Sequence, residues 1–306
     1  MLYYNTMLRR SLLAAATLLA VRPAHAQPKL RVVATFSILG DLVKEVGGDR
    51  LDLAVLVGPD VDAHTYQPKP TDVRVLSVAQ VLASNGLSFE GWIDRLAEAA
   101  PFKGRRVIAT TGVATLAAGG QDGHGHSHGQ GPDPHCWQDV GRVKRYVTNI
   151  ADGLAAADAA GAAIYRERAQ AYGARLDELD RWVRAAIAEV PAGQRKVITG
   201  HDSFRYFSNA YGVQFLAPRG FKTDSEPTAR DVAALIRQVR EQKIKALFVE
   251  NMTNPGLVDQ IARESGAVVG ARLYSDALSA PNGPAATYEA LMRHNVTALV
   301  AGMAKN

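Results

Sequence analysis

The chain has 306 residues, of which 47% are hydrophobic and 21% are charged, and its formal net charge is +5. This length exceeds that of most single domains and predicts two folded units. Arg9, Arg10 and Arg22 precede residue 27, so the remaining chain has 32 Lys and Arg residues against 30 Asp and Glu. Nucleic-acid binding usually requires a concentrated basic surface, and this near balance indicates none. We therefore expect no nucleic-acid partner.

The first 26 residues have the pattern of an export signal. Arg9 and Arg10 precede a short apolar run over residues 11–21, and residues 24–26 (Ala-His-Ala) form a small-x-small cleavage pattern. The run is too short to cross a membrane, which needs roughly 20 apolar residues. We expect Gln27 to begin the mature protein. The single cysteine is Cys136, so we expect no lipid attachment, no internal disulfide and a soluble periplasmic protein.

Residues 27–158 are predicted to form an N-terminal lobe in which strands and helices alternate. The predicted strands cover residues 30–36, 53–57, 81–83 and 107–109, and the predicted helices cover residues 38–46, 73–78 and 92–100. Gly47 and Gly48 end the first helix. Within this lobe, residues 119–131 are rich in glycine and predict a mobile loop that carries His124, His126 and His128.

A single rigid helix is predicted over residues 159–190. This stretch contains no proline, and its apolar residues recur at helical spacing: Ile164, Tyr172, Leu176, Leu179, Val183 and Ile187. At 1.5 Å per residue such a helix spans roughly 45 Å. A coiled coil is the alternative, but the flanking sequence has α/β character. We interpret the segment as a strut between two lobes.

Residues 191–306 are predicted to form a C-terminal lobe. Its predicted strands cover residues 196–199, 213–216, 246–249 and 268–271, and its predicted helices cover residues 229–242, 256–265 and 285–301. Strand–helix alternation in both halves is typical of the α/β class. The expected architecture is two lobes, each with a parallel β-sheet flanked by helices, joined by one long rigid helix.

Four side chains that are far apart in the sequence lie in loops that follow predicted strands. His64, His135 and His201 are flanked by proline or glycine, and Asp276 lies a few residues after the last strand. Parallel α/β sheets bind ligands beyond the carboxyl ends of their strands. A lone histidine or aspartate in a loop is more often structural than a ligand. The joint pattern, two residues from each half, indicates one shared site.

These segments make the sequence recognisable. It resembles the ZnuA/TroA-type zinc and manganese solute-binding proteins of ABC importers, known as the cluster A-I family. The resemblance lies in five segments: residues 62–68 (DAHTYQP), 133–137 (DPHCW), 201–204 (HDSF), 226–228 (EPT) and 274–278 (YSDAL). It implies that His64, His135, His201 and Asp276 bind one metal ion between two lobes. It also implies a membrane permease as partner, with a periplasmic metallochaperone as a second candidate, and we expect a monomer.

The resemblance favours zinc, with manganese as the alternative. Manganese members of the family usually have a glutamate where this chain has His201, and zinc suits three imidazoles and a carboxylate. Asp202, Glu226 and Glu250 are candidates to accept a hydrogen bond from a ligand imidazole. Helix capping is the alternative for Asp202, and a helix-terminus charge is the alternative for Glu226. We expect Cys136 to be buried rather than to bind metal.

The function that follows is capture of one zinc ion and its delivery to the permease. The Gly-rich loop with His124, His126 and His128 would bind further zinc weakly and pass it to the main site. A zinc hydrolase is the chief rival, but a catalytic zinc needs an open coordination position. Binding of an organic solute would require aromatic and arginine side chains that we do not locate in these loops. Nothing in the residues supports or excludes an adhesin.

Overall fold

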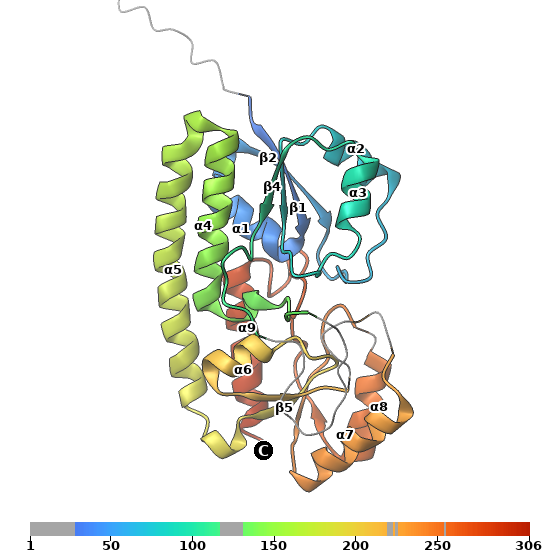
Figure 1. Ribbon diagram of the computed structural model, residues 1–306. Coiled ribbons are helices and arrows are strands. Elements are labelled where there is room, and N and C mark those ends of the chain that lie inside the picture. The colour runs from blue at the N-terminus through green and yellow to red at the C-terminus, as the bar shows by residue number, and fades with distance from the viewer. Residues whose placement is uncertain (1–27, 117–130, 219–222, 224–225, 254) are drawn as a thin grey trace, which may run out of the picture.

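The computed structural model describes residues 28–116, 131–218, 223, 226–253 and 255–306. They form two lobes, with a long helix beside both (Figure 1). Within these ranges, no helix has both the length and the apolar character needed to cross a membrane. The predicted export signal and the three histidines of the Gly-rich loop lie outside the described residues.

The N-terminal lobe contains a parallel sheet with the strand order β2-β1-β3-β4. Its strands are β1 (Leu30–Phe36), β2 (Leu51–Val57), β3 (Val81–Ser84) and β4 (Arg105–Ile108). Its helices are α1 (Ser37–Gly47), η1 (Gly48–Arg50), α2 (Pro70–Ser77) and α3 (Ile93–Ala99). All but one residue of β1 are buried, because helices cover both faces of a central parallel strand. The predicted order of strands and helices is confirmed.

The C-terminal lobe contains a second parallel sheet with the order β6-β5-β7-β8. Its strands are β5 (Lys196–Ile198), β6 (Gln214–Leu216), β7 (Ala246–Leu247) and β8 (Val268–Val269). A short helix, η4 (Ala192–Gln194), precedes β5. Its helices are α6 (Arg205–Tyr211), α7 (Ala229–Glu241), α8 (Pro255–Ser265) and α9 (Tyr288–Met303). Helix α9 begins three residues later than predicted because Thr287 caps it, accepting a hydrogen bond from the Ala290 backbone.

The long predicted helix is present, but its start differs from the prediction. Asp158 accepts a hydrogen bond from the Gly161 backbone, so the chain first forms a short turn, η3 (Ala159–Gly161), and then α5 (Ala162–Ala188). The buried stripe of α5 also begins at Tyr165 rather than at Ile164, which is 42% exposed. Tyr165 is seven residues before Tyr172, which keeps both on one side of the helix, whereas Ile164 is eight before it.

Helix α5 does not stand alone between the lobes. It packs against α4 (Val140–Ala157), α1 and α9, and in Figure 1 it runs alongside both lobes. The largest apolar cluster is continuous, joining Val33 of β1, Leu176 of α5, Phe207 of α6 and Leu299 of α9. Because separating the lobes would expose this cluster to water, we infer that they move little relative to each other.

Candidate metal centre

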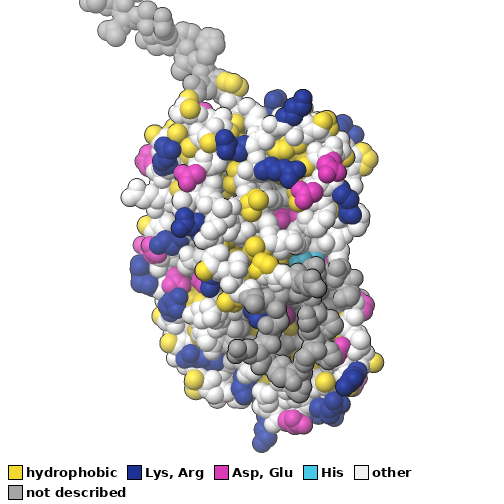
Figure 2. All heavy atoms as spheres, in the orientation of Figure 1, with side chains coloured by type: hydrophobic (Ala, Val, Ile, Leu, Met, Phe, Trp, Pro, Cys, Tyr) yellow, Lys and Arg dark blue, Asp and Glu magenta, His cyan; other side chains and the backbone are white. Residues whose placement is uncertain are grey.

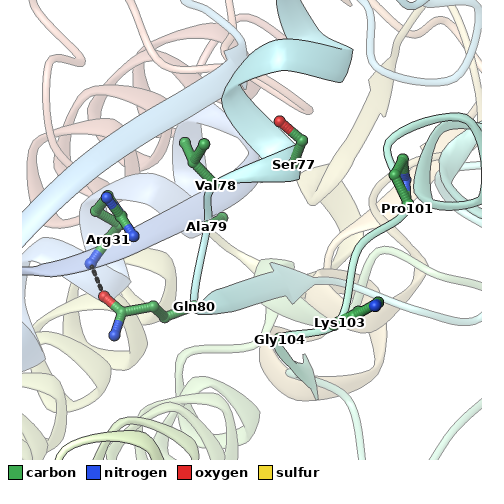
Figure 3. A pocket seen from close by; sticks show the side chains of 8 residues that line it. All are labelled: Arg31, Ser77, Val78, Ala79, Gln80, Pro101, Lys103 and Gly104. Carbon is green, nitrogen blue, oxygen red and sulfur yellow. Dashed lines mark hydrogen bonds between the residues drawn. The ribbon is translucent and has the colours of Figure 1, made fainter.

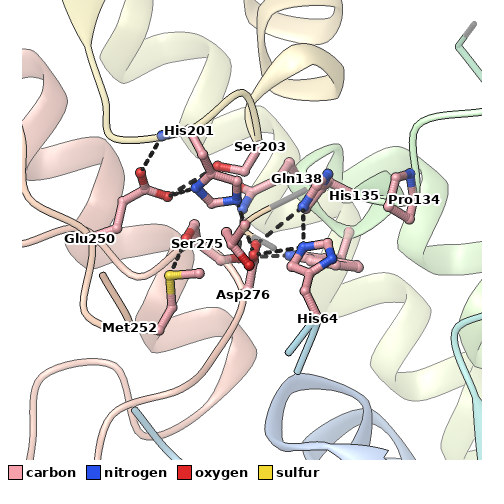
Figure 4. A network of polar contacts seen from close by, with 12 residues as sticks. His64, Pro134, His135, Gln138, His201, Ser203, Glu250, Met252, Ser275 and Asp276 are labelled. Atoms are coloured by element: carbon pink, nitrogen blue, oxygen red, sulfur yellow. Dashed lines mark hydrogen bonds and ion pairs between the residues drawn. The ribbon is translucent and has the colours of Figure 1, made fainter. Parts of the chain in front are cut away.

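His64, His135, His201 and Asp276 meet at the boundary between the lobes (Figure 4). Each offers one donor atom, and the four atoms lie within 4.8 Å of one another. His64 lies in the loop after β2 and His201 follows β5. His135 immediately precedes the short helix η2 (Cys136–Gln138), and Asp276 lies between β8 and α9. In Figure 2, histidine is visible on the displayed face only as a small patch near this boundary.

The spacing of the donor atoms suits a small tetrahedral cation. Asp276 Oδ2 lies 3.1 Å from His201 Nε2 and 3.3 Å from His64 Nε2, and Asp276 Oδ1 lies 3.5 Å from His135 Nε2. The Nε2 atoms of His64 and His135 are 3.3 Å apart. Donors bonded to tetrahedral zinc at roughly 2.0–2.1 Å stand about 3.3 Å from each other. Asp276 Oδ1 is also buried without a hydrogen-bond partner among the described residues.

Two of the histidines are fixed by the same local turn. Asp62 Oδ1 accepts the backbone N–H of His64 at 2.8 Å, and Asp133 Oδ1 accepts that of His135 at 2.9 Å. An aspartate side chain that accepts the backbone N–H two residues later forms an Asx turn. Asp133 Oδ1 also lies 2.8 Å from His135 Nδ1, which leaves Nε2 facing the other three side chains. Asp133 was not among the acceptors predicted from the sequence.

His201 is held by Glu250. Glu250 Oε2 lies 2.7 Å from His201 Nδ1, and Glu250 Oε1 accepts the backbone N–H groups of Gly200 and His201. Both side chains are completely buried, and Ser203 Oγ donates a further hydrogen bond to Glu250 Oε2. Glu250 is one of the acceptors predicted from the sequence, and its carboxylate contacts the His201 imidazole (Figure 4).

The structure places Asp202 elsewhere. Its Oδ2 atom lies 3.7 Å from Arg205 Nε, and its interaction with His135 and His201 is electrostatic. It does not cap the next helix either, because the residue before the first turn of α6 is Phe204. Glu226 is exposed, and its role as an acceptor stays a prediction.

Buried hydrogen bonds join the segment of His135 to that of Asp276. Trp137 Nε1 and Gln138 Nε2 both donate to the Ser275 backbone carbonyl at 2.8 Å. Because Ser275 directly precedes Asp276, these two bonds fix the carboxylate relative to His135. The site is thus organised by the protein itself, and a bound ion would not have to assemble it.

Neighbouring carboxylates make two of the imidazoles basic. Burial opposes a charge on His135, but Asp276 and Asp133 outweigh burial and raise the pKa of His135 to about 9. Burial also opposes a charge on His201, yet Glu250 and Asp276 raise the pKa of His201 well above its ordinary value. Without a metal ion, both imidazoles therefore carry a proton at neutral pH.

Asp276 and His64 are shifted in the opposite direction. Burial alone would raise the pKa of Asp276, but the imidazolium groups of His135 and His201 hold it well below its ordinary range. Burial lowers the pKa of His64, and Asp276 only partly offsets this effect. At neutral pH the cluster thus consists of a carboxylate, two imidazolium groups and one neutral imidazole.

Cys136, which is next to His135 in the sequence, is not part of the cluster. Its side chain is buried, and burial raises the pKa of the thiol to about 11, although Tyr206 counteracts part of this shift. A thiol with this pKa remains protonated at neutral pH, and the protonated form is a poor metal ligand. Its burial agrees with the expectation from the sequence.

A separate hollow of about 510 Å³ lies where the strands of the N-terminal sheet begin, beside the first residues of β1, β3 and β4 (Figure 3). The histidine cluster lies beyond the other end of these strands. Its lining includes Arg31, Lys103 and Gln80. The two cationic side chains would repel a metal ion, so this hollow is not a second metal site. On the face shown in Figure 2, basic and acidic side chains are interspersed rather than gathered into a basic patch.

Comparisons with known proteins place the chain in a family. Residues 32–302 match the family ZnuA, described as zinc-uptake complex component A, periplasmic. The manganese-binding lipoprotein MntA of Halalkalibacterium halodurans is 32% identical over 276 residues, covering 90% of this chain and 89% of that protein. The periplasmic zinc-binding protein TroA of Treponema pallidum has a TM-score of 0.82 at 29% identity, covering 90% of this chain and 99% of that one.

A Mn-bound periplasmic metal-binding protein from Candidatus Liberibacter asiaticus gives a TM-score of 0.78 at 27% identity, covering 90% of this chain and all of that one. The matched range thus extends over both lobes and includes the positions of the four cluster residues. Since the family match covers most of the chain, this protein belongs to the ZnuA family of periplasmic zinc-uptake complex components.

Proposed function

We propose that this protein binds one zinc ion through His64, His135, His201 and Asp276 and delivers it to the membrane permease of an ABC importer. The observation that carries the proposal is a set of four short distances, between 3.1 and 3.5 Å. Three join the two Asp276 oxygens to the Nε2 atoms of the histidines, and one joins His64 Nε2 to His135 Nε2. This spacing matches tetrahedral zinc ligation. As a member of its family, the protein is a metal-binding substrate-binding component of an ABC importer.

Manganese is the second candidate cargo. Similar proteins are named as manganese-binding, and both carboxylate oxygens of Asp276 face imidazoles, which would allow a fifth donor. Manganese nevertheless prefers oxygen-rich surroundings and more ligands than this cluster offers. The carboxylates of Asp133 and Glu250 are already engaged with His135 and His201. The nitrogen-rich donor set therefore favours zinc.

The rival interpretation as a zinc hydrolase requires a coordination position for water. Four protein donors complete a tetrahedral site, and Glu250, the nearest further carboxylate to His201, already contacts that imidazole at 2.7 Å. A closed site binds an ion without activating water. The arrangement thus supports transport and not catalysis.

We further propose that the protein acts in the periplasm after removal of residues 1–26, as a soluble monomer. MntA is named as a lipoprotein, whereas the only cysteine of this chain, Cys136, is buried in the N-terminal lobe. The alternating His and Gly residues that include His124, His126 and His128 would gather zinc weakly. A periplasmic metallochaperone would be an alternative source of the ion.

Metal competition tests the proposed cargo. The metal-free protein is expected to bind one equivalent of zinc tightly and to keep it against a large excess of manganese, because the donors are mostly nitrogen. The measurement is a titration with a zinc-sensitive chelator, with and without manganese, followed by metal analysis. Displacement of zinc by equimolar manganese would reassign the cargo. Turnover of ester or phosphoester substrates by the zinc-loaded protein would instead support the hydrolase.

Replacing Glu250 with glutamine is expected to weaken zinc binding about 10- to 100-fold, the usual range for losing the partner that orients a ligand imidazole. Glutamine keeps the size of the side chain but removes the charge that supports His201. The matched control is Glu241→Gln, which changes an exposed carboxylate at the end of α7 in the same lobe. Zinc affinity of both variants would be measured by chelator competition. Equal losses in the two variants would refute the role of Glu250.

A further inference from the structure

The four side chains of the proposed site are not held equally. The segments of His135 and Asp276 are joined through buried donors, Trp137 and Gln138, to the Ser275 carbonyl. The loop that carries His64 is tied to its own lobe by the buried bond from Trp92 Nε1 to the Ala63 carbonyl. It contacts the C-terminal lobe through one backbone bond and through side chains that are exposed or only partly buried. The side chain of His64 is also the only one of the four that is accessible by more than 1%. Among the four ligand candidates, the one on this loop is therefore the most accessible to solvent.

Asn251 connects this loop to the rest of the site. Its Nδ2 donates to Asp60 Oδ1 at 2.8 Å and to the Ala277 carbonyl at 3.3 Å. The backbone N–H of Asp60 donates to the Leu278 carbonyl at 3.0 Å. Asn251 directly follows Glu250, which contacts His201. One amide group thus links the His64 loop to the segments that hold His201 and Asp276.

Asn251 is held in an unfavourable local state. Asp60 has a φ of 57°, in the left-handed region that aspartate adopts more readily than most L-residues. Asn251 Oδ1 is buried without a hydrogen-bond partner among the described residues. Penalties of this kind persist where the surrounding structure imposes them, and they are concentrated at functional sites. The buried, unpartnered Asn251 Oδ1 is thus a cost to stability at this contact.

We propose that the hydrogen bond between Asp60 and Asn251 is a latch that keeps the His64 loop closed over a bound ion. This inference rests on the proposed metal-binding function. Opening the latch loosens the attachment of the loop to the C-terminal lobe, so His64 leaves the ion first while His135 and Asp276 stay joined. Asp60 is exposed and the other side chains of the site are not, so a docked permease could compete for the Asp60 carboxylate without touching the ligands.

Kinetics of zinc exchange test the latch. Asn251→Ala removes the donor, and Asp60→Gly removes the acceptor while tolerating the positive φ. Each variant is expected to release zinc about three- to tenfold faster than wild type, the range that corresponds to one net hydrogen bond. The rate constant of zinc binding should stay equal or rise, because an open loop admits the ion more easily. Stopped-flow mixing with excess chelator, and with zinc, gives the two rate constants.

Three further variants make the test specific. Asp60→Asn retains an acceptor oxygen and the left-handed conformation, so it should restore release to near the wild-type rate. Asn209→Ala, an exposed asparagine on α6, is the matched control and should have no effect. Asp60→Gly combined with Asn251→Ala should release zinc no faster than either single variant, because both remove the same contact.

The outcomes separate the latch from the proposed function. Wild-type release rates in Asn251→Ala and Asp60→Gly would overturn the latch but leave zinc binding by the protein intact. Slower zinc binding in these variants would also overturn it, since that result indicates a damaged site rather than an open one. If the wild-type protein binds no zinc, the proposed function fails and the latch fails with it.

Discussion

Zinc affinity is expected to fall by more than about a hundredfold when Asp276 is replaced with asparagine, beyond the range seen for groups that only support a ligand. Asp276 is the single anionic donor of the cluster, and its two oxygens lie 3.1–3.5 Å from the Nε2 atoms of three imidazoles. Asparagine keeps the shape of the side chain but removes the charge that faces the ion. Chelator competition and metal analysis of the purified variant provide the measurement.

Asp202→Asn is the matched control for this prediction. Asp202 also lies in a site loop, directly after His201, but its carboxylate pairs with Arg205 at 3.7 Å. We expect this variant to retain zinc like the wild type. A variant of Asp276 that binds zinc as tightly as the Asp202 variant would show that the carboxylate is not a ligand.

Zinc binding at pH 7 is expected to release about two protons, because coordination requires neutral imidazoles. His135, with a pKa of about 9, and His201, whose pKa is well above its ordinary value, are protonated in the metal-free cluster. His64 is neutral, since burial lowers its pKa. Zinc affinity should therefore rise steeply with pH, up to about a hundredfold per unit while both protons are displaced. Calorimetry in buffers of different ionisation enthalpy counts the protons.

The same groups should make the stability of the metal-free protein decrease as the pH rises, whereas zinc affinity increases. The pKa of His135 is raised on folding, so its contribution to the free energy of unfolding is fully present below about pH 6.5. It is lost as the pH rises through about 9. The melting temperature of the metal-free protein should thus decrease as the pH rises from about 6.5 to about 9. Over the same range, the increase in melting temperature that zinc produces should become larger. No proton release together with a flat melting temperature would contradict the assigned charges.

Most of the fold could be predicted from the sequence, because the signals are local. The apolar run of β1 and the proline-free stretch of α5 are readable from periodicity alone. The start of α5 was not predictable in the same way. It depends on Asp158, whose carboxylate accepts bonds from Arg50 and Tyr165 as well as from Gly161, and Arg50 is more than a hundred residues distant.

The four residues of the cluster could be predicted from the sequence, but not every residue that holds them in place. The loop positions of the histidines and the family resemblance together were enough to single out the four residues of the cluster. Asp133 was missed, although the same spacing of aspartate and histidine occurs in Asp62-Ala63-His64 and Asp133-Pro134-His135. That repeated spacing was the available signal.

The choice of Glu250 over Asp202 could not be made from the sequence. The direction of the Glu250 side chain follows from a parallel bridge between Glu250 and Leu273, which is a long-range pairing. Asp202 is adjacent to His201 in the chain, yet its carboxylate lies near Arg205 instead. Nearness in the sequence was thus a poor guide to the partner of the imidazole.

The most direct test is a crystal structure of the zinc-loaded protein with anomalous diffraction data collected on both sides of the zinc absorption edge. We expect one strong peak at the boundary between the lobes, bonded to the Nε2 atoms of His64, His135 and His201 and to the carboxylate of Asp276. Zinc bound elsewhere, with these four side chains still packed against each other and not against an ion, would contradict the proposed site.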